Sequence, residues 1–273
     1  MYYFNVITTA IFDPILGFAG PWQETFDLWF WPIFAGVGAL VIYKYLSNQR
    51  GIERAKNAIK VHLLEIRLYK DDLFGVVTST IKIILKNFVY IGHNIWPMLV
   101  MIGPMMAMLF QLEAEYAFRP MDVGDVELVK VQLDEDHAQV QATEVTWELP
   151  EGLELDVPPV RTAQGELVFR LRAVEEGDHV LKLFVGDEVV EEGIFVGGEE
   201  RKVPVMRTKG WEGYLYPGEA PLKADSQIWS ISTQYPEREL TGVPDGEIGI
   251  VLWFFGLSLV AGFGLKGVFG VTL

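Results

Sequence analysis

Few residues in this chain have the chemistry of an active site, and none of them forms a catalytic pattern. The four histidines, His62, His93, His137 and His179, are scattered, and no pair has the spacing that places two metal ligands on one helix face. The sequence has no cysteine, no phosphate-binding glycine loop and no nucleophile elbow. The acidic run 134–136 lacks the spacing of a calcium loop. We therefore expect no enzyme activity, no cofactor and no metal site.

The one chemical group that recurs at regular spacing is the methionine thioether. Met98, Met101, Met105 and Met108 follow one another at steps of three, four and three residues, which places them on one face of a helix. Three interpretations stay open: ordinary packing between helices, a flexible surface for apolar protein segments, and a Cu(I) site made of thioethers. Of the two functional interpretations, we favour a face that contacts client or partner proteins.

The charged residues are sorted along the chain in the manner of a membrane protein. Residues 44–86 hold nine Lys and Arg against four Asp and Glu, whereas residues 113–247 hold twelve against thirty. Lys and Arg that flank membrane spans stay on the cytoplasmic side. We therefore expect a bacterial-type inner membrane protein with its basic stretch in the cytoplasm and its acidic stretch in the periplasm. The acidic charge argues against a nucleic-acid partner.

Three apolar stretches approach the roughly 20 residues that a helix needs to cross the hydrocarbon core. They predict a first span over residues 26–46, a second over 95–112, and a third within 248–273, which also contains the cytoplasmic end. Lys44 and Lys266 mark the inner ends of the first and third spans. The N-terminus is therefore expected outside the cell and the C-terminus in the cytoplasm.

Prolines and small residues predict how these spans are shaped and packed. Pro97 and Pro104 are expected to loosen or kink the second span. Small side chains let helix backbones approach closely in a membrane. We expect such packing at Gly36 and Gly38 of the first span and at Ser258 and Gly262 of the third.

Residues 47–94 are expected to form a basic helical hairpin in the cytoplasm. Apolar residues and one histidine repeat at steps of three and four along its first helix: Ile52, Ala55, Ile59, His62, Ile66 and Tyr69. An acidic turn at 71–72 separates this helix from a second one. Five basic residues are expected to face anionic lipid at the inner membrane surface, unless they simply form a solvated face: Lys44, Arg50, Arg54, Lys56 and Lys60.

The remaining segments are expected outside the membrane. Residues 1–25 are aromatic-rich and read either as a segment lying in the membrane interface or as a loosely packed N-terminal arm. Residues 113–247 contain alternating stretches at 126–133, 138–149, 166–174, 179–185 and 188–196, separated by turn residues. Short strands at this spacing predict an acidic antiparallel β-sandwich of Ig-like size. The fold class is therefore an α+β membrane protein.

Residues 26–112 resemble the core of the YidC/Oxa1 membrane-insertase superfamily. That core is a span entering the cytoplasm, a basic helical hairpin and a proline-containing apolar span. Here the hairpin tip reads RLYKDD (67–72), and the following span reads NIWPMLVMIGPMMAMLFQL (94–112). The resemblance implies help for hydrophobic segments that enter lipid, without nucleotide hydrolysis.

The chain also departs from the bacterial members of that family. Residues 26–43 contain no basic residue where those members have a groove arginine, and Lys44 is the nearest substitute. The external β-domain follows the second span instead of preceding the core, and the later spans are reduced to one. A non-catalytic accessory subunit of a larger membrane complex, with a periplasmic docking domain, stays open as the alternative. In either case we expect membrane lipid and other membrane proteins as partners.

Overall fold

The computed structural model describes residues 2–16, 22–134, 145–162, 165–218 and 220–271, and the chain falls into two compact units. The first unit comprises Met1–Leu28 and Leu109–Leu252, and the second comprises Trp29–Met108 and Trp253–Leu273. The first unit holds the β-strands and the second is helical. The chain is therefore an α+β protein, as its alternating and apolar stretches predict.

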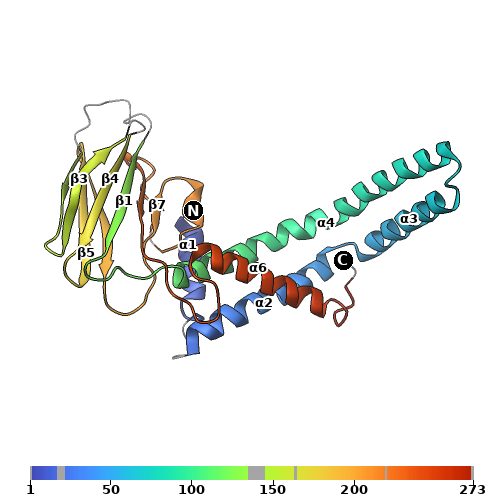
Figure 1. Cartoon of the computed structure of the whole chain (residues 1–273), viewed down its shortest axis with the longest axis horizontal. Helices are drawn as coiled ribbons and strands as arrows, with labels where there is room; N and C mark the ends of the chain where they lie inside the picture. Colours follow the sequence, from blue (N-terminus) through green and yellow to red (C-terminus); the bar gives the residue numbers. More distant parts are fainter. Residues whose placement is uncertain (1, 17–21, 135–144, 163–164, 219, 272–273) are drawn as a thin grey trace. The chain divides into compact units, whose positions relative to one another are not determined.

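The helical unit is built from parts of α2 (Gln23–Leu46), α4 (Leu73–Tyr116) and α6 (Gly246–Leu265) together with all of α3 (Gln49–Leu68). Figure 1 shows α3 and α4 running antiparallel to one another as a hairpin. Asn48 caps α3 by accepting a hydrogen bond from the backbone N–H of Gly51, 2.9 Å away. Asp72 does the same for Phe74 at the start of α4, over 3.2 Å. The first cap marks the start of α3 at its junction with α2, and the second marks the start of α4 after the hairpin turn.

Helix α4 is a single helix of 44 residues, although the sequence predicts a hairpin helix followed by a separate span. Pro97 and Pro104 both lie inside it. The helix also runs without interruption through Gly92, His93 and Asn94, and prolines are tolerated in long apolar helices. A helix of this length extends about 66 Å, roughly twice the hydrocarbon thickness of a bilayer. One half can therefore cross a membrane while the other half pairs with α3.

Helices α2, α4 and α6 are each long and apolar enough to cross a membrane. This agrees with the three spans that the sequence predicts. At one end of α2, Trp29 packs edge-on against Trp253 of α6, with ring centroids 4.8 Å apart. Tryptophan is enriched where spans meet the membrane–water boundary.

The predicted seam of α3 is buried at its start and opens towards the tip of the hairpin. Ile52 is fully buried and Ala55 nearly so, whereas Tyr69 is 60% exposed. His62 places Nδ1 2.8 Å from Oε2 of Glu65, and Ser79 of α4 donates a hydrogen bond to the same oxygen over 2.9 Å. The hydrogen bond with His62 and, to a smaller extent, the one from Ser79 hold the pKa of Glu65 below its usual value. His62 thus serves as a hydrogen-bonded structural residue.

The β-strands of the first unit form two antiparallel sheets (Figure 1). The larger has the order β3-β4-β1-β8-β7, and the smaller has the order β2-β5-β6. Their bounds are β1 Val126–Leu133, β2 Val145–Glu148, β3 Leu153–Arg161, β4 Glu166–Ala173, β5 Gly177–Val185, β6 Glu188–Val196, β7 Met206–Thr208 and β8 Ile228–Thr233. Side chains from both sheets pack into one hydrophobic core, including Val131, Phe169, Leu181 and Ile194.

Strands β1, β4, β5 and β6 lie close to the alternating stretches of the sequence. Residues 138–144 of the stretch 138–149 lie outside the described residues, and the described part of that stretch contains β2. Strand β3 was not predicted, because it contains Pro158 and Pro159 and pairs irregularly with β4 at an edge of the larger sheet. Strands β7 and β8 were not predicted either, because the segment after residue 199 shows turn residues and no long alternation.

The N-terminal segment forms helix α1 (Tyr2–Phe12) and is held to the first unit by polar contacts. The buried Asn5 donates from Nδ2 to the carbonyl oxygen of Gly213, 2.8 Å away. Gln111 donates from Nε2 to Thr8, and Lys202 pairs with the carboxylate of Asp13. The segment is therefore a helix docked on the rest of the first unit, and it is not the loosely packed arm that was one of its two interpretations.

Candidate functional site: an apolar groove in the helical unit

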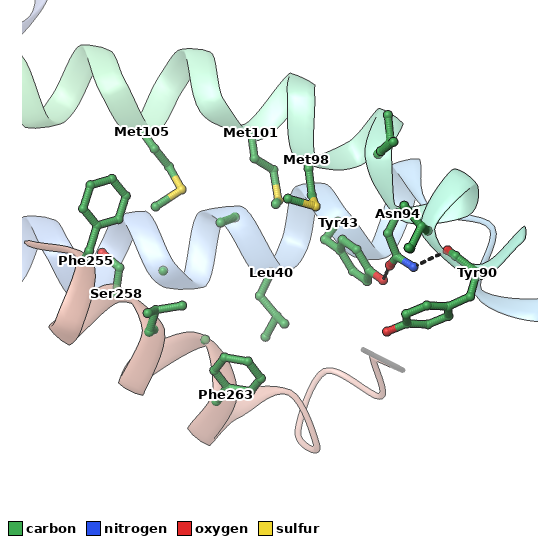
Figure 2. A pocket seen from close by; sticks show the side chains of 16 residues that line it. Leu40, Tyr43, Tyr90, Asn94, Met98, Met101, Met105, Phe255, Ser258 and Phe263 are labelled. Atoms are coloured by element: carbon green, nitrogen blue, oxygen red, sulfur yellow. Dashed lines mark hydrogen bonds between the residues drawn. The ribbon is translucent and has the colours of Figure 1, made fainter. Parts of the chain in front are cut away.

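A groove of about 510 Å³ lies between α2, α4 and α6 in the helical unit (Figure 2). Figure 2 shows side chains of all three helices pointing into it. Among the lining residues are Leu40 and Tyr43 of α2, Asn94, Met98, Met101 and Met105 of α4, and Phe255, Ser258 and Phe263 of α6. No charged residue lines the groove among the described parts of the chain. Its surface therefore suits an apolar ligand or protein segment.

Three of the four methionines of the predicted face line this groove. Met98 is 52% exposed, and Met101 and Met105 are partly buried. Met108 is only 9% exposed and is not a lining residue. Met98, Met101 and Met105 therefore line the groove, whereas Met108 is packed in the protein. The description as a client or partner surface stays a prediction, as does the thioether metal alternative.

The groove has a polar group near the end where α2 leads into α3. The hydroxyl of Tyr43 donates to the side-chain oxygen of Asn94, and the Asn94 amide donates to the carbonyl oxygen of Tyr90 over 2.6 Å. The ammonium of Lys56 lies 5.7 Å from the centre of the Tyr90 ring. Because Tyr43 and Asn94 bond one another, they lower the cost of burying polar atoms beside an apolar occupant.

Sequence reasoning missed the contributions of α2 and α6 to the groove. Leu40, Phe255 and Phe263 look like ordinary span residues, because nothing in an apolar run shows which neighbours it meets. Tyr43 and Asn94 are the exception, because each is an uncharged polar residue near one end of a predicted span. Two such residues at matching depth predict a contact between the spans.

The small residues predicted to pack helices differ in what they contact. A side-chain carbon built on Gly36 would lie 2.3 Å from the backbone oxygen of Ser258, so α2 and α6 are in backbone contact there. Ser258 also donates from Oγ to the carbonyl oxygen of Pro32, 2.8 Å away. A side-chain carbon on Gly262 would meet the oxygen of Gly36 at 3.6 Å, whereas one on Gly38 would meet nothing within 4 Å. Gly36, Ser258 and Gly262 form the contact, and Gly38 lies outside it.

The five basic residues expected at the inner membrane surface all lie outside the groove. Lys44, Arg50, Arg54 and Lys60 are exposed, and Lys56 is partly buried over Tyr90. They cluster at the end of α2 and along α3. The groove therefore lacks the positive charge that the bacterial YidC/Oxa1 members place in theirs, and Lys44 does not supply it.

Comparison of the chain with protein-family models, curated proteins and solved structures finds no match. The groove, the helix contacts and the distribution of charge are therefore the features of the chain that bear on its function.

Proposed function

We propose that this protein spans a bacterial-type inner membrane three times and assists the insertion or assembly of apolar membrane segments. In this proposal the N-terminus and an Ig-like β-sandwich lie in the periplasm, and the α3–α4 hairpin and the C-terminus lie in the cytoplasm. The positive charge of residues 44–86 supports that orientation. The observation that carries the functional proposal is the uncharged, methionine-lined groove between three candidate spans.

The physical basis of the proposed activity is a surface that accepts apolar side chains of varied shape. Methionine is unbranched and polarisable, so Met98, Met101 and Met105 can adapt to different occupants. Tyr43 and Asn94 offer a polar edge near the cytoplasmic end of the groove. A segment entering from the cytoplasm would meet this edge first and then the apolar wall. The resemblance of residues 26–112 to the YidC/Oxa1 core agrees with such a path.

A second candidate function is that of a fixed accessory subunit. It is favoured by the large apolar side chain of Val260, which α6 leaves exposed outside the groove. In a membrane such a face contacts either lipid or another spanning helix. In this alternative the groove holds one constant partner helix, and the acidic β-domain docks a periplasmic protein.

We expect Met101→Gln to impair insertion of an apolar client segment, because an amide without a partner would lie against the client. The expected loss is roughly twofold to thirtyfold in inserted product, since an unpaired amide costs about 0.5 to 2 kcal/mol. The measurement is protease protection of a radiolabelled single-span protein, made by translation in the presence of proteoliposomes that contain the purified full chain.

The matched control is Ile102→Gln, at the adjacent position of α4. Ile102 is 52% exposed and does not line the groove. The Ile102→Gln substitution introduces the same amide at nearly the same depth and should leave insertion close to the wild-type level. Equal losses for both variants would show that the groove is not the client surface.

A further inference from the structure

A second hollow of the helical unit, of about 300 Å³, lies where α3 begins beside α4. Its polar lining comes from Asn48, Arg54, Lys86 and His93, with Gly51 between them. We propose that this hollow, called here the headgroup pocket, binds the phosphate of an anionic glycerophospholipid from the cytoplasmic leaflet. The proposal depends on the membrane orientation proposed above, but not on insertion activity.

The charge of the headgroup pocket selects an anion. Arg54 and Lys86 are exposed, and no acidic residue lines the pocket. Within the described residues, neither of them has a carboxylate within ion-pair distance, and Arg54 bonds only the carbonyl oxygen of Arg50, from Nε at 3.2 Å. A guanidinium and an ammonium that converge without a counterion form a typical phosphate site.

Two further nitrogens converge at Gly51. A side-chain carbon on Gly51 would lie 2.8 Å from Nε2 of His93 and 2.8 Å from Nδ2 of Asn48. The Asn48 oxygen already accepts from the Gly51 backbone N–H, so the NH₂ group is the part left to bind a ligand. A side chain at Gly51 would collide with both groups, so the glycine lets the imidazole and the amide lie together against the start of α3, where both line the pocket.

The position of the pocket favours a lipid phosphate over a soluble one. It lies at the junction of α2 and α3, directly after the last residue of the first candidate span, Leu46. In the proposed orientation this is the level of the cytoplasmic headgroups. Ala55, Ala58 and Val89 supply an apolar wall beside the basic groups, which suits a glycerol backbone and the first methylene groups of its chains.

The test measures lipid binding to the purified full chain in a neutral detergent by native mass spectrometry. The probes are phosphatidylglycerol, phosphatidylcholine and inorganic phosphate. We expect phosphatidylglycerol to bind several-fold more tightly than phosphatidylcholine. The double variant Arg54→Gln/Lys86→Gln should weaken phosphatidylglycerol binding by about tenfold or more, since each basic residue near a membrane surface contributes roughly fivefold to binding of anionic lipid.

The matched control is Arg67→Gln/Lys82→Gln, which removes one arginine and one lysine from the same two helices outside the pocket. It should change phosphatidylglycerol binding less than twofold. Equal losses in both double variants would overturn the proposal in favour of a general charge effect. Equal affinity of the wild-type chain for both lipids would also overturn it, and this readout needs no variant to fold. Displacement of the lipid by millimolar phosphate would identify a soluble-anion site instead.

Discussion

Replacing Gly36 with valine is expected to separate α2 from α6 and to destabilise the helical unit strongly. The first side-chain carbon alone would lie 2.3 Å from the backbone oxygen of Ser258, far inside van der Waals contact. Neither backbone can yield without moving its helix, and the buried hydrogen bond from Ser258 to Pro32 would be strained or lost. Overpacking of this kind costs about 1–3 kcal/mol, and a branched side chain against backbone belongs at the upper end.

The matched control for this effect is Gly38→Val, two residues further along the same helix. A side-chain carbon there meets nothing within 4 Å, so no helix has to move. Its effect should stay within about 1 kcal/mol, the scale of helix propensity differences. The measurement is thermal unfolding of both full-length variants in the same detergent. Equal destabilisation would contradict the backbone contact between α2 and α6.

Replacing Arg207 with methionine is expected to destabilise the β-domain by leaving the carboxylate of Glu192 buried without its cation. Glu192 is fully buried, and one of its oxygens accepts from Nη1 of Arg207 over 2.9 Å. Arg207 also donates to the carbonyl oxygens of Glu191 and Ala220, so it joins β7 to β6 and to the segment between β7 and β8. Removing one partner of a buried ion pair costs about 3–5 kcal/mol.

The control for the ion pair is Arg201→Met, because Arg201 pairs with the exposed Asp178. Exposed pairs contribute little to stability, so this variant should unfold close to the wild-type denaturant concentration. Urea unfolding followed by tryptophan fluorescence measures both variants in the full chain. A shift in Arg201→Met as large as in Arg207→Met would show that burial does not distinguish the two pairs.

Much of the architecture is predictable from the sequence because its signals are local. The apolar runs around Gly36, Met101 and Ser258 predict three spans, and clean alternation predicts β1, β4, β5 and β6. Strands β3, β7 and β8 are not predictable in this way, because their pairing with β4 and β1 depends on contacts far away in the sequence. The continuity of α4 was missed because the hairpin helix and the second span were separated by their composition, which does not show whether one helix runs through both.

The candidate site is predictable only along a single helix. Helical spacing correctly places Met98, Met101 and Met105 on one face, but it also includes Met108, which tertiary packing buries. Small residues predict close packing at both Gly36 and Gly38, and only the position of α6 distinguishes them. The groove forms only where three helices pack together, and the periodicity of one helix does not show which other helices pack against it.

The central claim, that the groove contacts newly made membrane proteins, is tested most directly by photo-crosslinking in living cells. A photoreactive residue replaces Met101 in one strain and Met105 in another, because both line the groove. Cells that are translating are compared with cells in which translation has been stopped. We expect crosslinks to several newly made membrane proteins, which disappear when synthesis stops. One constant set of crosslinked partners, unchanged without synthesis, would contradict insertion and identify the protein as a fixed subunit.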